Sequence, residues 1–346
     1  GYIQKLPRCR NAPGGDNELA ATARAELSLG ISESERKALT ALSEATDWPI
    51  WRDKNTVTVD SEGRVVALRL GGYRLKGELP EALRNLRHLH VLHLGGNELE
   101  GAIPEWLGEL EGLEQLDLSY NSFRGELPAA LTNLRHLKVL DLGGNGLEGA
   151  TSGPIPEWLG ELEGLERLNL SNNSFRGELP EALRNLRHLK LLSLWSNKVE
   201  GAIPEWLGEL EGLEELDLSN NFFRGAIPEW LGELEGLEQL NLSENSFRGE
   251  LPEALRNLRH LNVLSLWSNK LEGAIPEWLG ELEGLEQLDL ANNSFRGELP
   301  EALGNLRYLK SLNLTWNKLE GAIPEWLGEL EGLEQLNLSN NSFRGE

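Results

Sequence analysis

A single 24-residue pattern recurs along about four-fifths of this 346-residue chain. It begins at Val65, and residues 89–112 show it in full as LxxLxLxxNxLxGxIPxxLGxLxx. Twelve copies follow one another; the fourth has 28 residues and the last stops at Glu346. One copy of this length cannot bury its apolar side chains alone, so neighbouring copies must stack into a solenoid.

The spacing within each copy predicts its local structure. Counting from the first leucine, the LxL segment at positions four to six reads as a short strand with both leucines inward. The asparagine at position nine can satisfy backbone groups where the chain turns away from the strand. The proline at position sixteen starts a short helical or 3-10 segment on the opposite, convex side. We therefore expect an α/β repeat solenoid with a concave parallel sheet.

Residues 1–64 do not follow the repeat and are predicted to form an N-terminal extension and cap, ahead of the repeat array at 65–346. Residues 17–29 read as a short helix, and Ser32 with Glu35 forms a capping box for a second helix to about residue 45. Residues 56–59 and 64–70 read as a β-hairpin, which with Trp48 and Trp51 would cover the first coil. No comparable cap closes the other end, so self-association there is an alternative to consider.

Charge and cysteine content narrow the partners. The net charge of −23 argues against nucleic acid and anionic membranes, because both are bound through lysine and arginine. No apolar run approaches the ~18 residues of a membrane span, so no membrane insertion is expected. Cys9 is the only cysteine, which favours a reducing, cytoplasmic location, with an extracellular one as the alternative.

Catalytic chemistry is not expected. The motifs GxxxxGK[ST], GxSxG, HExxH and CxxC are absent. The acidic residues recur with the repeat, as a solvated face does, and are not arranged as an isolated catalytic pair. We predict that the protein is not an enzyme and uses no catalytic residue, metal or cofactor.

The positions that vary between repeats predict a binding surface. Core and convex positions are almost copied along the chain, whereas positions three, five, seven and eight on the concave side change. Aromatic side chains on a polar sheet suggest interface anchors, although packing over neighbouring polar side chains is the alternative. The candidate ligand-binding residues are Trp195, Trp267, Trp316, Tyr120, His93, Asp117, Asp141, Asp217, Asp289, Gln239 and Gln287.

The repeat consensus LxGxIPxxLGxL over residues 65–346 resembles the plant-specific class of leucine-rich repeats. That class includes receptor-like kinase ectodomains and polygalacturonase-inhibiting proteins. The cap stretches ERKALTALSEATDWPIW and VTVDSEGRVVALRL look similar to repeat domains of algal ROCO GTPase proteins. The resemblance implies a right-handed superhelix whose concave sheet binds a protein or peptide, within a larger multidomain protein and in immune-type recognition. The alternatives are a structural spacer or oligomerisation scaffold, and an inhibitor of a secreted hydrolase.

Overall fold

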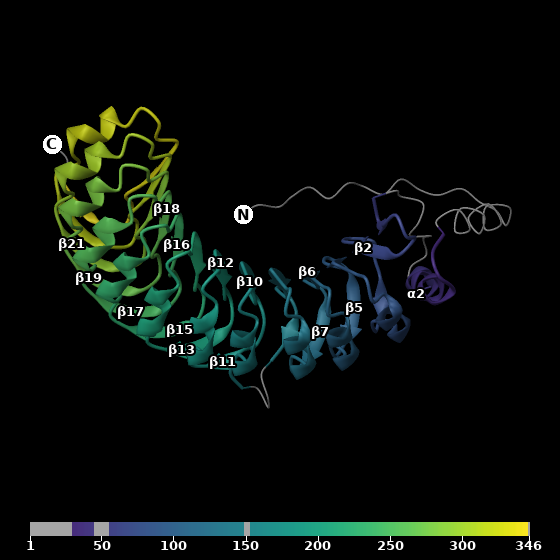
Figure 1. The fold of residues 1–346 in the computed structure, drawn as a ribbon. Helices are drawn as coiled ribbons and strands as arrows, with labels where there is room; N and C mark the ends of the chain where they lie inside the picture. The colour runs from purple at the N-terminus through teal and green to yellow at the C-terminus, as the bar shows by residue number, and fades with distance from the viewer. Residues whose placement is uncertain (1–29, 45–54, 149–152, 345–346) are drawn as a thin grey trace. The chain divides into compact units, whose positions relative to one another are not determined.

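The computed structural model describes residues 30–44, 55–148 and 153–344. The chain forms two compact units, Gly1–Leu147 and Glu148–Glu346, which are described separately (Figure 1). The boundary falls inside the fourth repeat, just before the four extra residues at 151–154. The predicted first helix at 17–29, Trp48, Trp51 and most of this insertion lie outside the described residues.

Each complete repeat forms one coil with the same three elements. In the coil that begins at Leu89 these are β4 (Val91–His93), β5 (Glu98–Gly101) and the 3-10 helix η3 (Glu105–Glu109). The helix follows Pro104, whose fixed φ suits a helix start. The expected strand and the 3-10 segment are therefore both present.

The first unit contains two sheets besides helix α2 (Glu33–Glu44). Strand β1 (Val57–Val59) pairs antiparallel with β2 (Val65–Arg69), and β2, β4, β6 (Gln115–Asp117) and β8 (Val139–Asp141) then pair in parallel. A second sheet has the order β3 (Lys76–Gly77), β5, β7 (Ser122–Gly125) and β9 (Gly146–Leu147). The remaining 3-10 helices are η2 (Glu81–Asn85) and η4 (Ala129–Asn133).

The second unit repeats this plan. Its main sheet is parallel throughout, and because the period is constant each residue pairs with the same position of the next repeat, as Leu192 does with Leu216. Its strands are β10 (Arg167–Asn169), β12 (Leu191–Ser193), β14 (Glu215–Asp217), β16 (Gln239–Asn241), β18 (Val263–Ser265), β20 (Gln287–Asp289), β22 (Ser311–Asn313) and β24 (Gln335–Asn337).

A parallel eight-stranded sheet forms another side of the second unit. In Figure 1 its labelled strands, from β11 to β21, form a row apart from the labelled strands of the main sheet, from β10 to β18. Its strands are β11 (Arg176–Gly177), β13 (Lys198–Gly201), β15 (Phe222–Gly225), β17 (Ser246–Gly249), β19 (Lys270–Gly273), β21 (Ser294–Gly297), β23 (Lys318–Gly321) and β25 (Ser342–Phe343). The 3-10 helices are η5 (Glu157–Glu161), η6 (Glu181–Asn185), η7 (Glu205–Glu209), η8 (Glu229–Glu233), η9 (Glu253–Asn257), η10 (Glu277–Glu281), η11 (Glu301–Asn305) and η12 (Glu325–Glu329).

The core of each unit is a set of side-chain ladders. The leucines at positions four and six are buried in every coil but the last, and position eleven adds a second ladder in which Phe223 and Phe247 stack with ring centroids 6.3 Å apart. Each buried large side chain contributes roughly 1.5–3 kcal/mol relative to exposure. Burial is shared between neighbouring coils, which is why the repeat predicted the fold.

The asparagine ladder at position nine is confirmed. The Asn221 amide nitrogen donates to the carbonyls of Leu194 and Leu218, and its oxygen accepts from the amide of Val199 at 3.0 Å. One buried side chain thus links backbone groups of adjacent coils. Without it these groups would lose their hydrogen-bond partners in the interior.

The predicted capping box and hairpin are also present. Glu35 N donates to Ser32 Oγ at 3.3 Å, and Ser32 N donates to Glu35 Oε2 at 3.1 Å, at the start of α2. The other carboxylate oxygen of Glu35 accepts from Val65 N at 2.9 Å, so this buried side chain ties α2 to the first repeat. The domain boundary at residue 64 itself stays a prediction.

Two kinds of repeat junction alternate on the helical side. Where a repeat ending RNLRH precedes one containing EWLGE, two arginines bind one glutamate, as Arg184 and Arg187 bind Glu209. Where EWLGE precedes EAL, a glycine lies against the next backbone: a Cβ on Gly232 would be 2.2 Å from the Ala254 oxygen. Between the repeats at 189–212 and 213–236, both containing EWLGE, neither arrangement exists, and Trp230 lies beside Gly208 instead.

Candidate functional site

The variable positions lie on the exposed side of the main sheet. In β12, Leu192 is buried while Leu191 and Ser193 are half-buried, as expected from side chains that alternate along a strand. We define the sheet face as the side chains at positions three, five, seven and eight of every repeat. All the candidate residues predicted from the sequence lie at these positions.

Position eight has an unusual backbone conformation. Trp316 has a φ of 55° and Tyr120 a φ of 50°, the left-handed region that glycine and asparagine adopt most readily. Both side chains are 62% exposed, so neither gains the burial that would offset the strain of a bulky residue there. Strained, exposed aromatic residues support a hypothesis of function.

The two tryptophans at position seven differ in exposure. Trp195 is 38% exposed, whereas Trp267 is half-buried and so only partly matches the expectation of an exposed ring. They occupy the same position in repeats that are three coils apart. Both follow a serine at position five and precede one at position eight.

The surroundings of these two tryptophans are duplicated as well. Ser196, next to Trp195, accepts a hydrogen bond from Asn220 Nδ2 of the next coil at 3.2 Å. Ser268, next to Trp267, accepts the same bond from Asn292 at 3.2 Å. The structure therefore contains one local arrangement twice on the same sheet face.

An aspartate completes each arrangement. Ser193 and Ser265, two residues before the tryptophans, pair in register with Asp217 and Asp289 of the following strand. Side chains two residues apart lie on the same face of an extended chain. Each tryptophan therefore shares the sheet face with the aspartate of the next coil, one strand across and two positions along.

Asp217 and Asp289 are held by the turn that follows their strands. Asp217 Oδ1 accepts from the amide and the hydroxyl of Ser219, at 2.9 and 2.5 Å. Asp289 Oδ1 accepts from Ala291 N at 3.0 Å, and its Oδ2 accepts from Asn313 at 3.1 Å. These bonds fix the direction of both carboxylates.

Burial raises the pKa of Asp217 above its usual value, and the hydrogen bonds from Ser219 and Asn241 oppose the shift only in part. Burial likewise raises the pKa of Asp289, against the bonds from Ala291 and Asn313. No lysine or arginine occupies the sheet face between residues 191 and 292, all of which are described. The sheet face itself therefore offers neither carboxylate a positive charge.

Gln239 and Gln287 are exposed at position three and add amide groups to the same region. Gln287 is on β20, the strand of Asp289, and Gln239 is on β16, between β14 and β18. They can donate and accept hydrogen bonds to a bound polar group.

The other candidate residues belong to the first unit. His93, Asp117 and Asp141 are in register on β4, β6 and β8, and His93 Nε2 lies 3.1 Å from the side-chain oxygen of Gln115. The ring of Tyr120 covers Gly144, whose Cβ, if present, would be 2.7 Å from the ring. These residues form a set separate from the tryptophans of the second unit.

Two exposed aromatic residues are not among the candidates predicted from the sequence. Phe222 is 61% exposed at position ten, beside the sheet face, and Tyr308 is 68% exposed at the end of its repeat. Phe222 interrupts the recurrent NSFRG, which reads NFFRG at this one place. That departure from the repeat could have identified Phe222 from the sequence alone.

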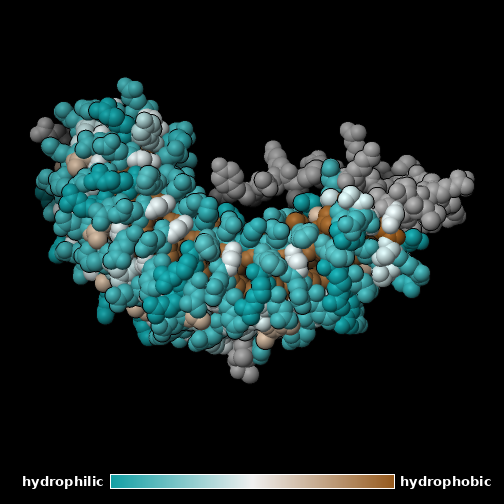
Figure 2. Space-filling model, in the orientation of Figure 1, coloured by the Kyte–Doolittle hydropathy of each residue, from teal (hydrophilic) through white to brown (hydrophobic). Residues whose placement is uncertain are grey.

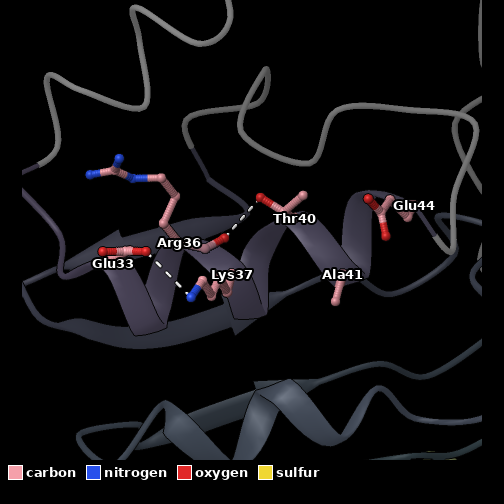
Figure 3. Close-up of a pocket in the computed structure, with 6 residues that line it drawn as sticks. All are labelled: Glu33, Arg36, Lys37, Thr40, Ala41 and Glu44. Atoms are coloured by element: carbon pink, nitrogen blue, oxygen red, sulfur yellow. Dashed lines mark hydrogen bonds and ion pairs between the residues drawn. The ribbon is translucent and has the colours of Figure 1, made fainter.

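Helix α2 carries a shallow depression lined by Glu33, Arg36, Lys37, Thr40, Ala41 and Glu44 (Figure 3). Lys37 pairs with Glu33 at 3.3 Å, and Thr40 donates to the Arg36 carbonyl, so several of its polar groups are engaged within the helix. Figure 2 shows that the visible surface is mostly hydrophilic, with small separate apolar areas. The depression carries no grouping that suggests chemistry.

Among the residues that the structure describes, His, Cys, Asp and Glu side chains do not gather in groups of three or more that could hold a metal ion. Among the same residues, every helix is too short or too polar to span a membrane.

Family comparisons match almost the whole repeat array. A "Leucine-rich repeat region" model matches residues 131–270, a "Leucine rich repeat" model matches 65–123 and 87–147, and a further "Leucine Rich Repeat" model matches 260–282, 284–306 and 308–330. The matches begin at residue 65, so the similarity of the cap to algal ROCO proteins stays a prediction. A search of the curated proteins finds no match.

Solved structures of plant receptors share the fold. A TDR receptor is 37% identical with a TM-score of 0.76, over 81% of this chain and 48% of that one. The ectodomain of the membrane receptor kinase GASSHO1/SCHENGEN3 from Arabidopsis thaliana, in complex with Casparian strip integrity factor 2, is 35% identical with a TM-score of 0.70, over 80% and 36%. The plant peptide hormone receptor RGFR1, in complex with RGF2, is 29% identical with a TM-score of 0.71, over 84% and 53%. The chain spans about half of these structures or less.

Proposed function

Since the chain is a leucine-rich-repeat protein, we propose that it is a recognition module which binds a protein or peptide on the sheet face of its second unit. Trp195, Trp267 and Trp316 are the anchors, and Asp217, Asp289, Gln239 and Gln287 supply polar contacts. The residues of the first unit, His93, Asp117, Tyr120 and Asp141, form a second patch for the same partner or another. Binding, and not catalysis, is the role of both.

The observation that carries the proposal is the strained and exposed position of Trp316. Trp316 has a φ of 55° and is 62% exposed, so its ring gains little stabilisation from burial in the free protein. Tryptophan is also enriched among the residues that contribute most to binding. A partner that covers the ring would recover the apolar burial that the free protein lacks.

The solved receptors add support by similarity. The RGFR1 structure is a peptide hormone receptor with its ligand, and it shares this fold over most of the present chain. An immune-type partner and a place in a larger multidomain protein remain parts of the proposal.

The receptors also bear on the compartment. The single cysteine favoured a cytoplasmic location, whereas GASSHO1/SCHENGEN3 is a membrane receptor kinase whose matched part is an ectodomain. We therefore propose the extracellular alternative. Fractionation of cells that express the tagged native gene tests it: tag in the cytosol alone would contradict it.

A selection from a random library of twelve-residue peptides tests the binding function. We expect peptides that bind the wild type and lose at least tenfold in affinity when all three tryptophans are replaced by alanine, because each anchor loss costs about 2 kcal/mol or more. Phe222→Ala, which changes an exposed ring outside the sheet face, is the matched control. If every enriched peptide binds the triple variant as well as the wild type, the proposal is wrong.

The oligomerisation alternative rests on one observation in the last two coils. Ile323 is 55% exposed and Leu336 is 46% exposed, although both occupy core positions of the repeat. A second copy that stacks there would bury them. Sedimentation velocity tests this: Ile323→Glu with Leu336→Glu should convert a dimer to a monomer, and a monomeric wild type would refute the alternative.

A further inference from the structure

One arrangement of side chains occurs twice on the sheet face of the second unit. Trp195 with Asp217, and Trp267 with Asp289, occupy the same positions of the repeat, with the same Ser–Asn hydrogen bond beside each. We call these two places subsite 1 and subsite 2. Because they share these residues and this hydrogen bond, each should take the same kind of group.

The chemistry of one subsite selects a cation. An indole face attracts a positive charge, most often that of arginine. The carboxylate beside it is partly desolvated, and no positive charge on the sheet face offsets it. An apolar group would bury the carboxylate further without a partner, whereas a guanidinium can stack on the ring and donate to the carboxylate together.

The charge of the surrounding face agrees with this selection. From residue 191 to 292 the sheet face carries four carboxylates, those of Glu215, Asp217, Glu244 and Asp289, and no lysine or arginine. The positive charges nearest in sequence to the two tryptophans are those of Lys198 and Lys270, which lie at position ten, outside the sheet face. Lys190 and Lys310 pair with Glu214 and Glu286. On the sheet face itself, a ligand along this stretch meets negative charge alone.

The distance between the subsites then sets the spacing on the ligand. They are three coils apart, and strands in a sheet are about 4.8 Å apart, so the separation is about 14 Å. An extended chain advances about 3.4 Å per residue, so four residues also span about 14 Å. We propose that the ligand of this face is an extended peptide with two basic residues, preferably arginines, four positions apart, one in each subsite. This proposal rests on the proposed binding function.

Two synthetic nine-residue peptides of equal composition test the spacing. One carries its two arginines four positions apart and the other two positions apart, and both are otherwise serine and threonine. Isothermal titration calorimetry should show at least tenfold tighter binding of the first peptide. Equal affinity for the two peptides would overturn the proposal, because simple charge attraction would then explain the binding.

Variants of the protein test the subsites. Asp217→Asn and Asp289→Asn should each weaken binding of the first peptide by about tenfold and remove the preference for its spacing. The matched control is Glu244→Gln, which removes the same charge from the sheet face at a residue that belongs to neither subsite. An equal loss in the control would overturn the proposal.

The peptide selection described above separates this inference from the binding function. Enriched peptides that depend on the tryptophans but lack paired basic residues would overturn the inference and leave the function standing. Enriched peptides that carry basic residues four apart and depend on both aspartates would support both.

Discussion

A pair of glycine substitutions tests the alternation of repeat junctions most sharply. Gly208 and Gly232 lie in identical EWLGELEG segments, in η7 and η8. A Cβ on Gly232 would lie 2.2 Å from the Ala254 oxygen and 2.6 Å from its carbonyl carbon. A Cβ on Gly208 would lie 3.1 Å from the Trp230 ring and 3.4 Å from a side-chain oxygen of Glu233.

The expected costs differ because the obstacles differ. The atoms against Gly232 are backbone, so the added methyl must push two coils apart. Overpacking of this kind costs roughly 1–3 kcal/mol and occasionally more, so we expect Gly232→Ala to lower the free energy of unfolding by about 3 kcal/mol. At Gly208 a side-chain ring needs to move by only a few tenths of an ångström. The lower chain entropy of alanine, worth about 0.4–1 kcal/mol, should leave Gly208→Ala nearly neutral.

Guanidinium unfolding followed by far-UV circular dichroism measures both variants. Because long repeat arrays can unfold in parts, hydrogen exchange of the amides in η8 and η9 is needed to locate the loss. Gly328→Ala is a further control, since nothing lies within 4 Å of its added Cβ. Equal destabilisation by Gly208→Ala and Gly232→Ala would refute the reasoning, because the two segments would then pack alike.

Three further predictions concern charge and hydrogen bonding. The raised pKa of Asp217 means that its stability contribution is present below the unfolded value of 3.8 and is lost as the pH rises through the folded pKa. Asp217→Asn keeps the oxygen that accepts from Ser219 and removes the charge, so it should raise stability in urea at pH 7 and lose that gain below pH 3.8; a gain that persists there would contradict burial as the cause. Asn221→Ala leaves buried backbone groups unpaired and should cost on the order of 1–3 kcal/mol in thermal unfolding, and a cost near zero would show that the ladder is dispensable. Glu211→Arg should place an arginine at the repeat position of Arg187, which binds Glu209 of the next coil. An ion pair with Glu233 should then raise the free energy of unfolding by up to about 1 kcal/mol at low salt, and a gain that is unchanged at high salt would exclude an ion pair.

Much of the fold could be derived from the repeat alone. Each coil contacts only its neighbours, so a position such as that of Leu192 or Asn221 meets the same environment in every copy that has a coil on both sides. Burial, strand register and the asparagine bonds then follow from one 24-residue pattern. Phe222 departs from the pattern, and that departure alone indicates an exposed aromatic side chain in this repeat.

Only part of the candidate site could be predicted from the repeat pattern. The variable positions pointed to Trp195, Trp267 and Trp316, and the structure puts all three on the sheet face of one compact unit. The sequence did not reveal that Trp316 adopts a left-handed φ or that Trp267 is more buried than Trp195. Nor did the sequence show that Tyr120 belongs to a different compact unit from the three tryptophans.

Periodicity tells which residues of successive coils are neighbours, but distances of a few tenths of an ångström depend on what the next coil contributes. The same glycine meets a backbone oxygen when alanine follows and an indole when tryptophan follows, as Gly232 and Gly208 show. Likewise, the pKa of Asp217 depends on how neighbouring groups exclude water from its carboxylate. Hydrophobic spacing is a property of the chain, whereas close contact and desolvation arise only when the coils are packed together.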